Sequence, residues 1–147
     1  MDIQLNTSYK DNMDLLLQMV YETELNYDEM AGYTDNRELL DFLGKRANQC
    51  NEFAREIQCV YGYKGDDFEP ESFYSFQDLV FSRGLVVSDD ELLLTAVLQW
   101  EALLQDVYKE VMMLNRLPDD VYDILENQLN QIAFEKSKIE VDSYSAA

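Results

Sequence analysis

Residues 94–108 read Leu-Thr-Ala-Val-Leu-Gln-Trp-Glu-Ala-Leu-Leu-Gln-Asp-Val-Tyr and form the most apolar segment of the chain. Within it, Val97, Trp100 and Leu104 recur at steps of three and four residues, which is the spacing of one face of an α-helix. Glu101 stands in the middle of this segment. An isolated ionised carboxylate is strongly unfavourable in an apolar interior, so Glu101 must either face water or meet a partner. The stretch therefore predicts a core helix and raises the question of what lies opposite Glu101.

The same period extends on both sides of this helix and predicts an all-α protein. We expect helices at residues 7–32, 36–61, 88–114 and 118–141, within a single domain that covers residues 1–147. The first break is short, so the first two helices should form an antiparallel hairpin. Residues 63–87 form a long crossover in which residues 71–82 could make a short extra helix. A long crossover lets the third helix lie parallel to the second, as in ferritin-like four-helix bundles.

Composition excludes several classes of function. The chain has 30 acidic and 11 basic residues, a formal charge of -19. Binding to nucleic acid or to an anionic membrane depends on Lys and Arg, so we expect neither. An acidic mimic remains open, because Asp119, Asp120, Asp123 and Glu126 partly form a row, although any solvated helix face shows such rows. The chain has no histidine, which removes Ser-His-Asp and Cys-His sites and the commonest metal ligand.

The two cysteines do not predict a disulfide. Cys50 and Cys59 lie nine residues apart in one predicted helix, so they point to opposite faces and cannot pair. We expect free buried thiols and a cytoplasmic location. The first residues contain no basic region followed by an apolar run, so no signal peptide is expected. No apolar run approaches the ~18 residues of a membrane span.

Several segments together resemble a bacterial ferritin-like domain family of unknown function, the YciF-type stress proteins. Glu22–Tyr27 resembles that family's Asp-Gly-Glu-x-Gly-Tyr stretch, and Phe76–Leu79 resembles its Trp-x-Asp-Leu. Further similar segments are Ala47–Phe53, Asp89–Glu91 with Glu101 and Tyr108, and Leu117–Val121 followed by Glu126–Leu129. The likeness covers most of the chain. It implies a ferritin-like bundle, whose members usually bind two metal ions through inward-facing carboxylates and histidines.

This chain departs from that ligand set. Asn48 and Gln49 stand where the family's second helix offers carboxylates, and Lys136 stands where the fourth helix would place a histidine. Amides are weak donors to iron or manganese, and an ammonium adds a positive charge. We therefore interpret the chain as a degenerate member without metal or other cofactor. If any metal site exists, its ligands would be Glu22, Glu24, Glu52 and Glu101.

The retained Glu101 suggests a buried charge cluster instead of a metal centre. Lys136 and Arg46 both lie on stripes that could face the interior, and Glu24 lies on the stripe of the first helix. In one arrangement, Arg46 or Lys136 takes the place of the metal as counter-charge to Glu101. In the other, Glu101 lies at the edge of its stripe in water, and Lys136 extends to the surface. The sequence alone leaves both arrangements open.

The function predicted from the sequence is a non-enzymatic, metal-free helical bundle, related to stress or acting as an interaction or structural module. A homodimer and a protein partner are expected, although no residue selects their faces. An aromatic cluster in the crossover, Phe68, Phe73, Tyr74, Phe76 and Phe81, could cover one end of the bundle or form a patch for a partner. The alternative function is a metal-binding protein or oxidoreductase that uses carboxylates only.

Overall fold

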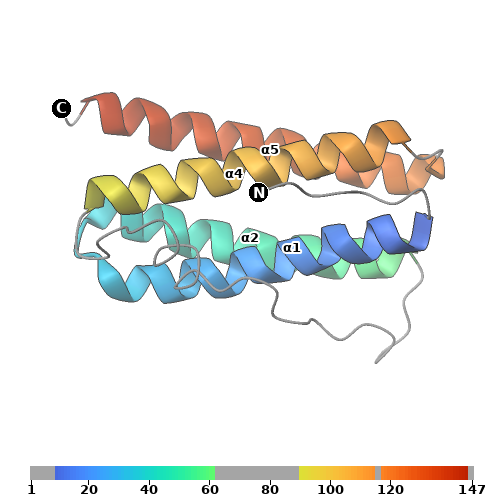
Figure 1. The fold of residues 1–147 in the computed structure, drawn as a ribbon, viewed down its shortest axis with the longest axis horizontal. Coiled ribbons are helices and arrows are strands. Elements are labelled where there is room, and N and C mark those ends of the chain that lie inside the picture. Colours follow the sequence, from blue (N-terminus) through green and yellow to red (C-terminus); the bar gives the residue numbers. More distant parts are fainter. Residues whose placement is uncertain (1–8, 62–89, 115–116, 146–147) are drawn as a thin grey trace.

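The computed structural model describes residues 9–61, 90–114 and 117–145 and is all-helical over these ranges. Its elements are α1 (Tyr9–Met30), the 3₁₀ turn η1 (Ala31–Tyr33), α2 (Arg37–Tyr61), α4 (Asp90–Leu114) and α5 (Asp119–Ser145) (Figure 1). The predicted all-α class is confirmed for this part of the chain. Outside the described residues lie the expected starts of two helices, at residues 7–8 and 88–89, and the crossover at residues 63–87, with its short helix at 71–82 and its aromatic cluster.

The helix boundaries follow from local chemistry. Asn36 caps α2, because its Oδ1 atom accepts a hydrogen bond from the Leu39 N–H at 2.9 Å. α5 begins directly after Pro118, whose carbonyl accepts the Tyr122 N–H at 3.0 Å. The predicted end of the first helix, at about residue 32, is two residues late: α1 ends at Met30, and the chain tightens there into the 3₁₀ turn around Gly32. The predicted end of the last helix at 141 was also too early, because no glycine or proline interrupts the chain before Ser145.

The four helices lie side by side in a bundle. α1 packs against α2 and α4, and α5 packs against α2 and α4, so α2 and α4 occupy diagonal positions. Figure 1 shows α2 and α4 running in one direction and α1 and α5 in the other. Thr34, which precedes α2, donates a hydrogen bond from its hydroxyl to Asp90 at the start of α4. This contact also places the first residues of α2 and α4 at the same end of the bundle.

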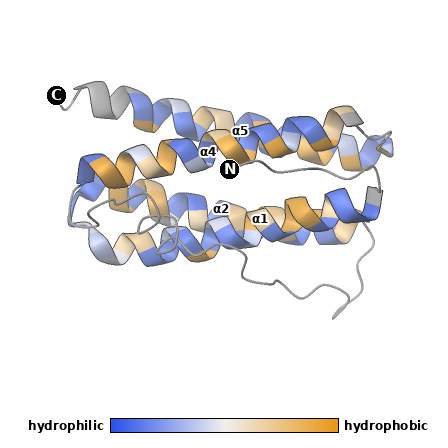
Figure 2. Ribbon diagram, viewed as in Figure 1, coloured by the Kyte–Doolittle hydropathy of each residue, from blue (hydrophilic) through white to orange (hydrophobic). Residues whose placement is uncertain are grey.

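The predicted apolar stripes meet in one core. Each helix alternates hydrophobic and hydrophilic residues along its length (Figure 2), as expected of amphipathic helices around a shared interior. Fully buried members come from all four helices and include Leu16 and Val20, Leu43 and Ile57, Val97 and Leu104, and Leu125 and Ile132. Cys50 is buried as expected, but Cys59 is exposed, which corrects the prediction of two buried thiols. The nine residues between the two cysteines turn them to different faces of α2, and only the face of Cys50 meets the core.

Candidate functional site

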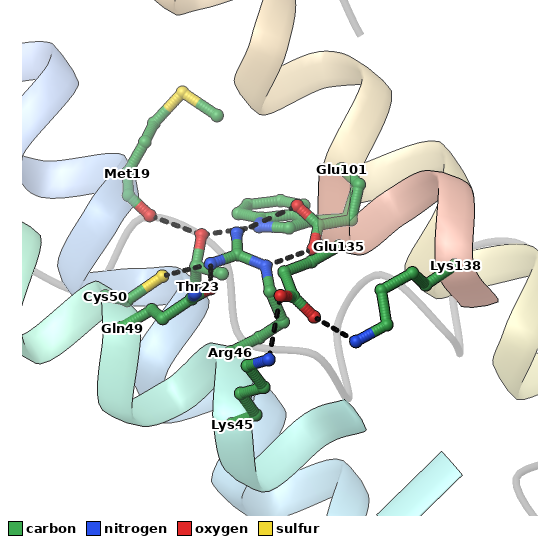
Figure 3. A network of polar contacts seen from close by, with 10 residues as sticks. Met19, Thr23, Lys45, Arg46, Gln49, Cys50, Glu101, Glu135 and Lys138 are labelled. Atoms are coloured by element: carbon green, nitrogen blue, oxygen red, sulfur yellow. Dashed lines mark hydrogen bonds and ion pairs between the residues drawn. The ribbon is translucent and has the colours of Figure 1, made fainter. Parts of the chain in front are cut away.

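The most unusual feature of the core is a fully buried ion pair between Arg46 of α2 and Glu101 of α4. Arg46 Nε lies 2.6 Å from Glu101 Oε1, and Arg46 Nη2 lies 2.9 Å from Glu101 Oε2. Both side chains have 0% exposure. Each carboxylate oxygen therefore accepts one hydrogen bond from the planar guanidinium, the two-point geometry that arginine makes with carboxylates. Because α2 and α4 are diagonal neighbours, the pair crosses the centre of the bundle (Figure 3).

Helical spacing explains why these two charged residues face inward. Arg46 lies on the buried stripe of α2 that also carries Leu43, Ala47 and Cys50. Glu101 lies four residues after Val97 and beside the buried Trp100. Neither residue can leave the core without rotating its whole helix and exposing these apolar neighbours.

Arg46 makes further contacts within its own helix. Its Nη1 atom donates to Gln49 Oε1 at 3.2 Å and lies 3.7 Å from Cys50 Sγ. Gln49, predicted from the sequence to stand where the resembling family carries a carboxylate, serves here as an acceptor for the guanidinium. Asn48, the other amide, is exposed. The polar groups of the guanidinium are thus largely satisfied by protein atoms, as burial of a charge requires.

Burial and charge together fix the ionisation of this region. Burial alone lowers the pKa of Arg46, but Cys50, Glu101 and Tyr27 together have the larger effect and raise the pKa of Arg46 above its ordinary value. Burial raises the pKa of the Cys50 thiol to about 12, with a smaller contribution from the charge of Glu101, while Arg46 opposes the shift. At neutral pH the guanidinium is charged and the thiol is protonated. Because the thiolate is the reactive form, Cys50 is a poor nucleophile.

Tyr27 of α1 lies beside the Arg46–Glu101 ion pair. Its side chain is 1% exposed, and its hydroxyl makes no hydrogen bond. Burial raises the pKa of Tyr27 well above its ordinary value, and the nearby negative charge of Glu101 raises it further. The hydroxyl therefore lies close to the carboxylate, and a weak side-chain interaction with Glu101 adds to the rise in pKa, although its geometry falls short of a hydrogen bond. A buried hydroxyl without a partner is uncommon and costs stability.

Two other buried polar contacts tie the helices together. Trp100 Nε1 donates to Thr23 Oγ1 at 2.7 Å, and the Thr23 hydroxyl donates to the Met19 carbonyl at 2.7 Å, which links α4 to α1. Tyr108 donates its hydroxyl to Gln128 Oε1 at 2.6 Å, and Gln128 Nε2 donates to the Phe53 carbonyl at 3.2 Å. The second contact joins α4, α5 and α2. The sequence placed Trp100 on a buried helical face but did not single out Gln128. The available signal was its spacing, because Gln128 lies three residues after the buried Leu125 on the same face of α5.

The other predicted site residues do not gather around Glu101. Glu22 is buried and accepts a hydrogen bond from Gln18 at 3.4 Å, Glu24 is half-buried and Glu52 is exposed. Lys136 does not pair with Glu101, because its Nζ atom lies 3.7 Å from Glu140 one turn along α5. No group of three or more Cys, Asp or Glu side chains placed to hold a metal ion occurs among the described residues. The structure thus joins Glu101 to Arg46 and leaves Lys136 near the surface.

A further buried carboxylate, besides Glu101 and Glu22, was not anticipated. Glu135 of α5 is 5% exposed, and its Oε1 atom lies 2.9 Å from Lys45 Nζ of α2. Its Oε2 atom lies 4.0 Å from Lys138 Nζ (Figure 3). Both lysines are about half exposed, so this network lies at the edge of the core between α2 and α5. Sequence reasoning had selected the neighbouring Lys136, one residue away on the helix.

Comparison with protein-family models, with curated proteins and with solved structures found no match to this chain. Among the described helices, none combines the length and the apolar character needed to cross a lipid bilayer.

Proposed function

We propose that this chain is a non-enzymatic, metal-free bundle of the ferritin-like type that acts as a structural or interaction module. The observation that supports the proposal is the two-point contact of Arg46 with Glu101 at the centre of the core. In ferritin-like bundles, inward carboxylates from the helices hold metal ions at this depth. Here a guanidinium supplies the positive charge that a carboxylate in such a position needs.

The residues of the site do not fit a metal ion. Both oxygens of Glu101 accept hydrogen bonds from Arg46, so a metal would have to displace a permanently charged guanidinium. A divalent cation beside that guanidinium would also be repelled. Of the three other candidate ligands, Glu52 is exposed and Glu24 is half-buried. We derive no metal chemistry from this arrangement.

The direction of the helices supports the ferritin-like part of the proposal. α2 and α4 run parallel, which is the arrangement that a long crossover between the second and third helices of a bundle produces. The resemblance to YciF-type stress proteins points to a role in stress response. That role, a cytoplasmic location and a homodimer stay predictions, since no described contact tests them.

Elemental analysis tests the proposal directly. The purified chain should contain no iron or manganese above background, both as isolated and after incubation with ferrous iron and with manganese. Near-stoichiometric metal in the wild-type chain would contradict it and would favour the alternative, a carboxylate-only metal site. The observation that favours this alternative is the burial of two of its candidate ligands, Glu22 and Glu101. A Glu22→Gln variant would then lose metal if Glu22 were a ligand. An exposed-site control that is not a candidate ligand, Glu56→Gln, would separate ligand loss from a general loss of charge.

A further inference from the structure

The outer side of α4 and α5, near the end of α4 and the beginning of α5, carries exposed apolar side chains. Met113 is 84% exposed and Tyr122 is 39% exposed. Met112 and Leu129 are half-buried and pack against the edge of the core. We name Met112, Met113, Tyr122 and Leu129 the α4–α5 apolar face. Exposed apolar side chains that cluster in this way usually mark a contact site.

The contacts of the core show on which side of α4 this face begins. On α4, Trp100 reaches α1 through Thr23, whereas Tyr108 reaches α5 through Gln128. Met112 follows Tyr108 by one helical turn, so it lies on the α5 side of α4. Met113 is the next residue and lies further out on the same helix.

On α5, the apolar face lies on the side next to α4. Its buried face is bounded on the α2 side by Glu135, which contacts Lys45. Tyr122 and Leu129 are seven residues apart and share one face, beyond the opposite edge of the buried stripe. That opposite edge is the side of α4. Because α4 and α5 are antiparallel and adjacent, the end of α4 with Met112 and Met113 meets the beginning of α5 with Tyr122.

Carboxylates flank the apolar face on both helices. Asp119 and Glu126 lie one turn before and one turn after Tyr122, and both are exposed. Asp106 and Glu110 lie two turns and one turn before Met113 and are exposed as well. None of these four carboxylates forms an ion pair within the described ranges. Among the described residues, the exposed Lys109 also lies one turn before Met113. The face is thus apolar with a largely acidic border.

We propose that the α4–α5 apolar face binds the apolar side of a basic amphipathic helix from a partner protein. An apolar strip between two helices suits a third helix laid along it, and the flanking carboxylates complement Lys and Arg at the edges of that helix. A second copy of the chain fits less well. A symmetric pair would bring Asp119 and Glu126 of both copies together, and each chain carries a formal charge of -19. The proposal rests on the proposed function, because it specifies the partner of an interaction module.

The test uses a synthetic helix of leucine and lysine, with leucines at heptad spacing, and a leucine–glutamate counterpart. Binding of each fluorescently labelled peptide to the full chain is measured by anisotropy at physiological salt. The key variant is Met113→Gln with Tyr122→Gln. The matched control is Leu25→Gln with Phe134→Gln, which removes two apolar side chains, 61% and 60% exposed, from other faces without changing the charge. Circular dichroism confirms that both variants fold.

We expect the leucine–lysine peptide to bind and its affinity to fall about tenfold or more in the Met113/Tyr122 variant, a loss of ~1.4 kcal/mol. The Leu25/Phe134 control should change it less than about twofold, and the leucine–glutamate peptide should not bind. Equal losses in the two variants, or no binding, would overturn the proposal. A dimer in sedimentation equilibrium that the Met113/Tyr122 variant dissociates would assign the face to a second copy. Metal uptake by the wild-type chain would instead contradict the proposed function and leave the peptide comparison unchanged.

Discussion

Replacing one member of the Arg46–Glu101 pair should destabilise the fold severely, while replacing both should not. In an Arg46→Met variant, the Glu101 carboxylate would remain at 0% exposure without a counter-charge. In a Glu101→Leu variant, the guanidinium would remain charged in the same place. Both substitutions keep an apolar side chain of similar length, so the lost charge partner dominates over a change in packing.

The geometry sets the magnitude. The pair contains two hydrogen bonds between charged groups, at 2.6 and 2.9 Å, and each such bond is worth ~1.5–3 kcal/mol. Loss of one partner of a buried pair costs ~3–5 kcal/mol, which agrees with this sum. A domain is stable by ~5–15 kcal/mol, so each single variant should lose a large part of its stability. Glu101→Leu should lose more than Arg46→Met, because a lone carboxyl can take up a proton whereas the guanidinium stays charged.

The double variant, Arg46→Met with Glu101→Leu, should be as stable as the wild type or more stable by ~1–4 kcal/mol. Its two apolar side chains avoid the desolvation of two charges, which the attraction between them only partly offsets. The coupling free energy of the cycle should therefore exceed ~3 kcal/mol. The Arg46→Met variant should also gain stability relative to the wild type as the pH is lowered, since protonation removes its unpaired charge.

Urea unfolding at neutral pH measures these differences. Trp100 is the only tryptophan, is buried, and is hydrogen-bonded to Thr23, so its fluorescence should follow unfolding of the core alongside circular dichroism. The control is Lys45→Met, one residue away, whose side chain is 51% exposed and whose partner Glu135 retains Lys138. That change should cost less than ~1 kcal/mol. A loss below ~1 kcal/mol in both single variants would refute the reasoning, because neither charge could then be buried as described.

Three other variants or conditions give independent predictions. Tyr108→Phe should destabilise the fold by ~1–3 kcal/mol in urea unfolding, because the buried Gln128 loses the hydroxyl that donates to it. Tyr27→Phe should cost little or stabilise the fold, since the Tyr27 hydroxyl has no hydrogen bond. Equal losses of stability in the two variants would contradict this. Gly44→Ala should raise stability by ~0.5–1 kcal/mol, because Gly44 is exposed within α2 and an added Cβ would meet no atom within 4 Å. An unchanged or lower unfolding midpoint in urea would contradict this. At alkaline pH, burial raises the pKa values of Cys50, Tyr27 and Tyr108, so the folded state binds protons more tightly than the unfolded state. Stability should therefore fall by ~1.4 kcal/mol per pH unit for each group as the pH rises above its ordinary pKa, which is 9.0 for Cys50 and 10.0 for the two tyrosines. Phenolate absorbance should therefore show Tyr27 and Tyr108 ionising only with unfolding, and their ionisation in the folded state would contradict the burial.

The helices were predictable because each carries its own signal. The period of three and four residues selected the buried stripe of α2, and Asn36 capped the helix close to the expected position. The errors occurred at helix ends, where local signals are weakest. The expected end of the first helix lay within two residues of Met30, but the change to a 3₁₀ turn over Ala31–Tyr33 depends on how the chain meets α2.

The candidate site was predictable only in part. Its existence followed from a carboxylate on an apolar stripe, but the choice of partner depended on which helices are diagonal neighbours. Arg46 and Lys136 were equivalent from spacing alone, since both lay on predicted inward stripes. In the structure, Arg46 is at 0% exposure, whereas the side chain of Lys136 retains 24% and pairs along α5 with Glu140. The resemblance to a metal-binding family favoured Lys136 as the partner of Glu101, because Lys136 stands where that family places a histidine. The chemistry of arginine favours Arg46 instead, because its planar guanidinium can contact both oxygens of a buried carboxylate.

The ion pair contributes more to the arrangement of the helices than to the free energy of the fold. An apolar pair at the same positions would be at least as stable by the estimate above, so net stability does not account for it. A two-point contact across the diagonal, however, is satisfied only when α2 and α4 have one relative rotation and one relative shift along their axes. Leucine and methionine at these positions would tolerate neighbouring registers, because apolar contacts have no fixed direction. Arg46 and Glu101 thus impose on the bundle centre the kind of directional constraint that ligands of fixed geometry impose at a metal site.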